Sequence, residues 1–186
     1  MKEEIKPGYT RVSSVLSPFM RMDKINTEVL ANAANRGTRV HLAADAILAD
    51  VGYPFEEQDE GYIESFKLWV PGKKFLERPQ RLYDDEFMIT GDLDLLYDNG
   101  NGITLVDLKT SSAVSKSWML QGSAYSYMAK KLGYEITKIE FVKLDKSGKY
   151  PKIYNYEENF GLFLHCLEVY NYFFKNFEEP REYDYI

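Results

Sequence analysis

The chain has 186 residues, a formal net charge of −6 and 45% hydrophobic residues. This length suits one domain with a single core, and the hydrophobic content is too high for an intrinsically disordered chain. The single cysteine, Cys166, excludes an internal disulfide, a zinc site built from several cysteines and an iron–sulfur cluster held by the chain's own thiolates. We therefore expect one domain over residues 1–186.

Membrane and targeting features are absent from the sequence pattern. The first ten residues, MKEEIKPGYT, lack the apolar core of a signal peptide, and no run is long and apolar enough to span a bilayer. We expect a cytoplasmic protein that does not engage a membrane. The negative net charge argues, at this level, against a nucleic-acid partner.

Residues 1–72 predict a helical N-terminal part. An extended arm over residues 1–22 contains a short element at TRVSSVL. A helix begins at Asn26 or Thr27, and the Arg36–Gly37 step is expected to interrupt or bend it. A second helical stretch then ends at Gly52, and a further helix covers residues 60–69.

Residues 73–176 predict a sheet with two more helices, followed by a short polar tail at 177–186. Two-residue alternation, which is typical of strands, replaces the helical pattern after residue 72. The predicted strands are 74–78, 80–83, 86–97, 103–110, 137–144 and 150–154, and the predicted helices are 115–132 and 157–176. This order predicts an α/β (α+β) fold with a central mixed β-sheet flanked by helices.

One predicted hairpin carries a pattern of charged side chains. Its turn, Asp-Asn-Gly-Asn-Gly at 98–102, is rich in residues that tolerate positive φ. A turn of two or four residues makes the paired residue numbers sum to 201, which places Asp94 opposite Asp107 and Asp92 opposite Lys109. A three-residue turn would instead separate the two carboxylates onto opposite faces. Strand alternation also places Asp107 and Lys109 on one face.

Two carboxylates in this register need a compensating charge. Directly opposed residues have Cβ atoms about 4.5–5.5 Å apart, and like charges there are destabilising. A divalent cation supplies the compensation, and Mg²⁺ prefers oxygen ligands. Lys109 can then contact a phosphate or help to activate a metal-bound water. The alternative is a solvated hairpin whose aspartates face water, with Lys109 as a counter-ion.

These residues resemble the PD-(D/E)XK nuclease superfamily, in particular its RecB-like branch with the lambda-type exonucleases and the mitochondrial genome maintenance exonuclease. That branch carries Gly-x-x-Asp on one strand, Asp/Glu-x-Lys on the next and Gln-x-x-x-Tyr on the following helix. Here the matching segments are Gly91 to Asp94, Asp107 to Lys109 and Gln121 to Tyr125. An upstream Arg-Gly with a histidine is matched by Arg36 to His41, and the resemblance covers roughly residues 9–155. The proline of the superfamily's name is absent.

The resemblance implies a metal site. It implies Asp94, Asp107 and the Leu108 carbonyl as metal ligands, with His41 as a further ligand and Glu77 at an acidic position seen in several members. A half-buried helix histidine and a surface strand glutamate are the ordinary alternatives for the last two.

The resemblance also implies catalytic and substrate-binding residues. Lys109 would be the catalytic lysine, and Asp94 and Asp107 would share the catalytic role. Gln121 and Tyr125 share one helix face and would meet the substrate or support the ligands. Arg36 would bind a phosphate. A core position for Tyr125 and a structural pairing for Arg36 remain the alternatives.

The fold and function implied are a restriction-endonuclease-like core and a metal-dependent DNA exonuclease. The expected cofactor is one or two Mg²⁺ or Mn²⁺ ions without an iron–sulfur cluster, since Cys166 is alone. DNA is the expected substrate, and a single-strand annealing or recombination protein is the expected partner. The expected role is phage or bacterial recombination or repair, and the expected location is the cytoplasm of a bacterial or phage-infected cell. The alternatives are an endonuclease of the same chemistry, a non-catalytic DNA-binding subunit, and an α+β protein with surface carboxylates. The oligomeric state is left open.

The charge is unevenly distributed along the chain. Residues 101–152 contain nine Lys or Arg and four Asp or Glu, against an acidic excess before and after them. This block begins just before Asp107 and continues through the lysines at positions 143, 146, 149 and 152. A groove that follows a nucleic-acid backbone can use such a stretch, so the net charge does not exclude DNA.

Overall fold

A computed structural model describes residues 4–20 and 25–175. The chain begins with β1 (Thr10–Arg11), α1 (Val12–Leu16) and the 3₁₀ turn η1 (Ser17–Met20). The long helix α2 (Thr27–Leu48) follows, and then come η3 (Glu57–Asp59) and α3 (Glu60–Trp69). The predicted tail at 177–186 lies outside the described residues, and the division of the chain into helical part, sheet and tail within one domain stays a prediction.

Helix α2 is continuous from Thr27 to Leu48, so the expected interruption at the Arg36–Gly37 step is wrong. Asn26 caps the helix as predicted, because its side chain accepts a hydrogen bond from the Glu28 amide at 2.8 Å. A single interior glycine costs a helix only about 1 kcal/mol. The burial of Val40 and Ala44 against the sheet opposes that cost.

Two sheets form, and both mix parallel and antiparallel pairs. The larger sheet has the order β2-β5-β6-β7-β8, in which β6 and β7 are parallel and the other pairs are antiparallel. The smaller sheet has the order β1-β4-β3. The strands after β1 are β2 (Lys74–Phe75), β3 (Leu82–Asp84), β4 (Ile89–Gly91), β5 (Leu95–Asp98), β6 (Ile103–Lys109), β7 (Ile136–Lys143) and β8 (Lys152–Tyr156).

The predicted strand 86–97 is two strands in different sheets. Strand β4 ends at Gly91 and β5 begins at Leu95, so the intervening segment passes from the small sheet to the large one. Leu93 packs into one core cluster and Leu95 into the other. Regular alternation would place these two leucines on one face, so the expected alternation fails here.

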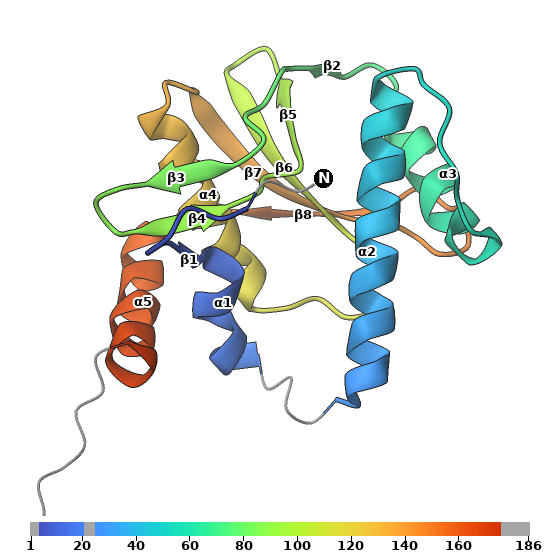
Figure 1. The fold of residues 1–186 in the computed structure, drawn as a ribbon. Coiled ribbons are helices and arrows are strands. Elements are labelled where there is room, and N and C mark those ends of the chain that lie inside the picture. The colour runs from blue at the N-terminus through green and yellow to red at the C-terminus, as the bar shows by residue number, and fades with distance from the viewer. Residues whose placement is uncertain (1–3, 21–24, 176–186) are drawn as a thin grey trace, which may run out of the picture.

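Helices cover both faces of the large sheet (Figure 1). On one face, α2 and α3 bury Val40, Phe66 and Trp69 against Val106 and Leu108. On the other face lies α4 (Ser117–Lys131), with α1 and α5 (Phe160–Phe174) packed against it. The predicted class, an α+β fold with a mixed central sheet flanked by helices, is confirmed. Within the described ranges, no helix is long and apolar enough to cross a membrane.

Candidate active site

The hairpin between β5 and β6 has the register expected for a turn of two or four residues. Leu95 pairs with Val106 and Asp98 pairs with Ile103, so paired numbers sum to 201 across a four-residue turn. Gly100 in that turn has a φ of 83°, which glycine adopts without strain. Asp94 follows directly beyond the last pair, and its Oδ2 accepts a hydrogen bond from the Leu108 amide at 2.7 Å. The two carboxylate positions therefore lie on neighbouring chain segments.

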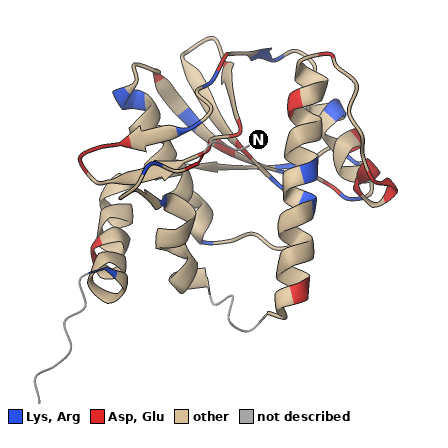
Figure 2. Ribbon diagram, viewed as in Figure 1, with Lys and Arg blue, Asp and Glu red and all other residues tan. Residues whose placement is uncertain are grey.

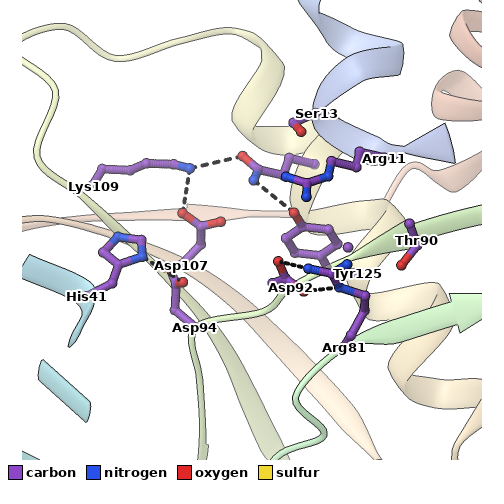
Figure 3. Close-up of a pocket in the computed structure, with 12 residues that line it drawn as sticks. Arg11, Ser13, His41, Arg81, Thr90, Asp92, Asp94, Asp107, Lys109 and Tyr125 are labelled. Carbon is purple, nitrogen blue, oxygen red and sulfur yellow. Dashed lines mark hydrogen bonds and ion pairs between the residues drawn. The ribbon is translucent and has the colours of Figure 1, made fainter. Parts of the chain in front are cut away.

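A cavity of about 200 Å³ opens at this point (Figure 3). It lies where the end of β4, the start of β5, the end of β6 and helices α1, α2 and α4 meet. Six of the nine predicted site residues line it: His41, Asp94, Asp107, Lys109, Gln121 and Tyr125. The full lining is Arg11, Ser13, His41, Arg81, Thr90, Gly91, Asp92, Asp94, Asp107, Lys109, Gln121 and Tyr125.

His41 joins the first carboxylate to the backbone of β6. Its Nδ1 lies 3.1 Å from Asp94 Oδ1, and its Nε2 lies 3.1 Å from the Leu108 carbonyl oxygen. Both partners only accept hydrogen bonds, so the ring satisfies both when each nitrogen carries a proton. Burial opposes the charge on His41, but the Asp94 carboxylate outweighs it, and the pKa of His41 is raised. Burial likewise disfavours charge on Asp94, but the facing His41 and Lys109 hold its pKa below the usual value.

Asp107 is buried and lies against the catalytic lysine candidate. Lys109 Nζ is 2.6 Å from Asp107 Oδ2. That oxygen has no partner with hydrogen-bond geometry among the described residues. Burial, with the nearby Asp94 charge, outweighs the attraction of Lys109 and raises the pKa of Asp107 to about 6. Lys109 therefore compensates the buried charge of Asp107 only in part.

A chain of hydrogen bonds fixes the lysine from helix α4. Lys109 Nζ donates to Gln121 Oε1 at 3.0 Å, and Gln121 Nε2 donates to the Tyr125 hydroxyl at 3.2 Å. Tyr125 is buried in the core on the α4 side, and burial raises its pKa. The tyrosine is therefore both a core residue and the last member of the chain that positions Lys109.

The glycine of the Gly-x-x-Asp segment has a packing reason in this fold. A Cβ atom added at Gly91 would lie 2.3 Å from Cε1 of the Tyr125 ring. Any larger residue at this position would push the ring, and with it the hydroxyl that holds Gln121, out of place. The motifs on β4 and α4 are therefore linked by direct contact.

Three charged residues at the cavity are not among those expected from the sequence. Asp92 does not face Lys109 as predicted, because Arg81 holds it with two hydrogen bonds of 2.7 and 3.0 Å. Arg81 comes from the loop before β3, in the small sheet, and Arg11 lies in β1. Arg11 is exposed at the cavity mouth. Among the sequence patterns, only the short element TRVSSVL, which contains Arg11 and Ser13, pointed to this part of the cavity wall.

Three predicted residues are not among those that line the cavity: Glu77, Arg36 and Leu108, whose expected ligand is its backbone carbonyl. Glu77 is exposed and does not contribute to the cavity wall. Arg36 is half-buried on α2, where it donates to the Thr110 carbonyl oxygen at 3.3 Å and lies over the Tyr62 ring. Arg36 therefore has a structural contact at the end of β6, and its expected phosphate contact stays a prediction.

The donor set fits a hard divalent cation. Asp94 and Asp107 line one cavity, and the Leu108 carbonyl oxygen lies 3.1 Å from Nε2 of His41, which lines the same cavity. Mg²⁺ prefers carboxylate and carbonyl oxygens of this kind. Asp107 Oδ2 is buried, its contact with the Lys109 ammonium lacks hydrogen-bond geometry, and a bound cation would add to the compensation of its charge. In this conformation His41 and Lys109 occupy the acceptors, and no three His, Cys, Asp or Glu among the described residues converge as a complete metal site.

Comparisons with known proteins give likenesses in structure only. No family model and no curated protein matches the sequence. Among solved structures, the protein SSO0001 is similar to this chain, with a TM-score of 0.51 and 13% identity over 97% of this chain and 82% of the other. An alkaline exonuclease from Laribacter hongkongensis, LHK-Exo, gives a TM-score of 0.45 and 13% identity over 91% and 92% of the two chains. The likeness to SSO0001 concerns the fold alone and assigns no activity.

Proposed function

We propose that this protein is a metal-dependent nuclease that hydrolyses phosphodiester bonds in DNA, and that it acts as an exonuclease. One observation carries the proposal: Asp94, Asp107 and Lys109 line a single cavity. The motifs that resemble the PD-(D/E)XK superfamily thus meet in space in the combination that this chemistry requires. The choice of exonuclease, and of a setting in recombination or repair, rests on the resemblance of the motifs.

Asp94, Asp107 and the Leu108 carbonyl would hold Mg²⁺ or Mn²⁺, with His41 as a candidate further ligand. When bound, the cation would lower the pKa of a water molecule and stabilise negative charge on the phosphate. The raised pKa of Asp107 fits this role, because a buried carboxylate of this kind gains from a nearby cation. Glu77 and a second ion stay predictions from the resemblance.

Lys109 would act on the phosphate or the attacking water. Its ammonium lies at the cavity with its position set by Asp107 and Gln121. A fixed positive charge at that place stabilises the charge that develops on the phosphate in the transition state. Gln121 and Tyr125 would keep the ammonium in place, and the exposed Arg11 would contact a neighbouring phosphate.

The test is digestion of DNA labelled at the 5′ or the 3′ end, as single strands and as duplexes, with Mg²⁺ or Mn²⁺ and with a chelator as control. We expect metal-dependent release of nucleotides from one end, no nicking of closed circular DNA, and loss of cleavage in Asp107→Ala and Lys109→Ala. Nicking or linearisation of the circle would identify an endonuclease. Undiminished cleavage by either folded variant would overturn the assignment of the site.

A further inference from the structure

A row of three lysines crosses the large sheet beside the cavity. Lys109 pairs with Lys143 across β6 and β7, and Lys143 pairs with Lys152 across β7 and β8. Neighbouring strands are about 4.8 Å apart, so the three backbone positions span about 10 Å. The row begins at the lysine that lines the cavity and ends on the edge strand β8.

All three lysines belong to the same face of the sheet. Lys109 reaches Gln121 on α4, which defines the α4 face. Phe141 and Tyr154 pack into the core on that face, and they lie two residues from Lys143 and Lys152 along their strands. Because side chains alternate along a strand, the two lysines extend to the face that carries Lys109.

Lys143 and Lys152 are unpaired cations. No acidic group lies within ion-pair distance of either one in the described part of the chain, and neither has a hydrogen bond to another side chain there. Lys143 is half-buried and Lys152 is exposed. Unpaired lysines close together repel one another, so a row of this kind gains from a bound polyanion.

The charged residues of α2, η3 and α3 differ from these lysines in their pairing. Acidic residues gather at η3 and the start of α3 (Figure 2). The arginines near these elements are already engaged, since Arg39 on α2 pairs with Asp59 and Arg78, in the loop before β3, pairs with Asp45. Lys143 and Lys152 therefore offer positive charge that these arginines do not.

An exposed aromatic ring lies next to the end of the row. Tyr150 is 56% exposed and precedes Lys152 by two residues in the connection between β7 and β8. Exposed aromatic rings beside lysines are the usual combination in sites that bind single strands, because rings stack on bases while lysines contact phosphates.

We propose that Lys143 and Lys152 extend the cavity into a track for the phosphate backbone of a single DNA strand, which runs from Lys109 across β7 to β8. This inference rests on the proposed nuclease function for the identity of the polyanion. It adds the side of the molecule over which the strand lies and the residues that hold it.

The test measures binding of a fluorescent single-stranded oligonucleotide to the full chain at several salt concentrations, with Ca²⁺ in place of the catalytic ion. Wild type is compared with Lys143→Gln/Lys152→Gln and with Lys152→Gln alone, which alters only an exposed side chain. The matched control is Lys67→Gln/Lys74→Gln, which removes the same charge from α3 and from β2 at the other edge of the sheet.

We expect the double variant to bind the oligonucleotide more weakly than wild type. Each phosphate contact of a single strand contributes about 0.7 to the slope of log affinity against log salt concentration. The slope should therefore be shallower by about 1.4 for the double variant and by about 0.7 for Lys152→Gln. The control should keep the wild-type slope. Equal losses in control and test variants, a wild-type slope in the test variants, or no binding by wild type would each overturn the track. Lysine-dependent binding without hydrolysis under Mg²⁺ or Mn²⁺ would leave the track standing and reject the nuclease function.

Discussion

The ammonium of Lys109 is held from two elements, by Asp107 on its own strand and by Gln121 on helix α4. A lysine side chain has four rotatable bonds, and two fixed partners remove most of that freedom. The cavity therefore presents a charge at a set position before any substrate arrives, which is the condition for electrostatic stabilisation of a transition state.

Gln121→Ala should reduce turnover more than substrate binding. The substitution leaves Lys109 intact but removes the acceptor that orients it, and misplacement of a catalytic group by about 1 Å costs up to about 100-fold. We expect kcat to fall by about 10- to 100-fold with little change in KM, and Gln121→Glu, which keeps an oxygen acceptor, to recover part of the loss. A rise in KM at constant kcat would show that Gln121 binds substrate and does not position Lys109.

Asp107→Asn should not destabilise the metal-free protein at pH 8. Burial raises the folded-state pKa of Asp107 to about 6, above the unfolded value, so its charge costs stability above pH 6 and the cost disappears as the pH falls toward 4. The cost is at most about 3 kcal/mol, because one pKa unit corresponds to about 1.4 kcal/mol. Thermal unfolding should give the variant an equal or higher Tm at pH 8 and a smaller difference at pH 5.

Added Mn²⁺ provides the control for that comparison. It should raise the Tm of wild type and leave the Tm of Asp107→Asn nearly unchanged, because a ligand stabilises only the state that binds it. A variant that is several degrees less stable than wild type at pH 8 without metal would contradict the account of this carboxylate.

At the scale of elements, the contact between β4 and α4 couples folding to the site. Gly91→Ala places a Cβ against the Tyr125 ring and should lower the free energy of unfolding by about 1–3 kcal/mol. Gly52→Ala, where an added Cβ meets nothing within 4 Å, should change it by less than about 0.5 kcal/mol. Chemical denaturation measures both.

A double variant separates this clash from a general effect on β4. With Tyr125→Ala in the same chain, the cost of Gly91→Ala should shrink, which gives a coupling energy above about 0.5 kcal/mol. Additive costs would show that the ring and the glycine do not act through their contact.

Local sequence narrowed the hairpin register to two possibilities, because a turn of two or four residues and a turn of three residues pair the strands differently. The structure has the four-residue turn. The prediction of one strand over residues 86–97 was wrong, because the alternation of the sequence continues through Asp92 and Asp94. Only the packing of Leu93 and Leu95 into different core clusters divides this segment into two strands. The continuity of α2 through Gly37 likewise depends on tertiary packing, which helix propensity does not contain.

At the scale of the whole molecule, the site collects residues from distant parts of the chain. The sequence order of the motifs predicted Asp94, Asp107, Lys109 and Gln121 together, since they follow one another on a hairpin and the next helix. Arg11 lies in β1 of the small sheet and Arg81 directly before β3, and no local pattern indicates that this part of the fold closes the cavity. Glu77, expected from its place before the Asp94 strand, is exposed outside the cavity lining.

The central claim is that Asp94 and Asp107 together hold a divalent cation beside Lys109, and calorimetric titration of the protein with Mn²⁺ tests it most directly. We expect saturable binding by wild type, loss of that binding in Asp94→Asn and Asp107→Asn, and wild-type binding by Asp98→Asn, which alters a carboxylate of the same hairpin outside the cavity. No saturable binding by wild type, or wild-type affinity in Asp107→Asn, would contradict it.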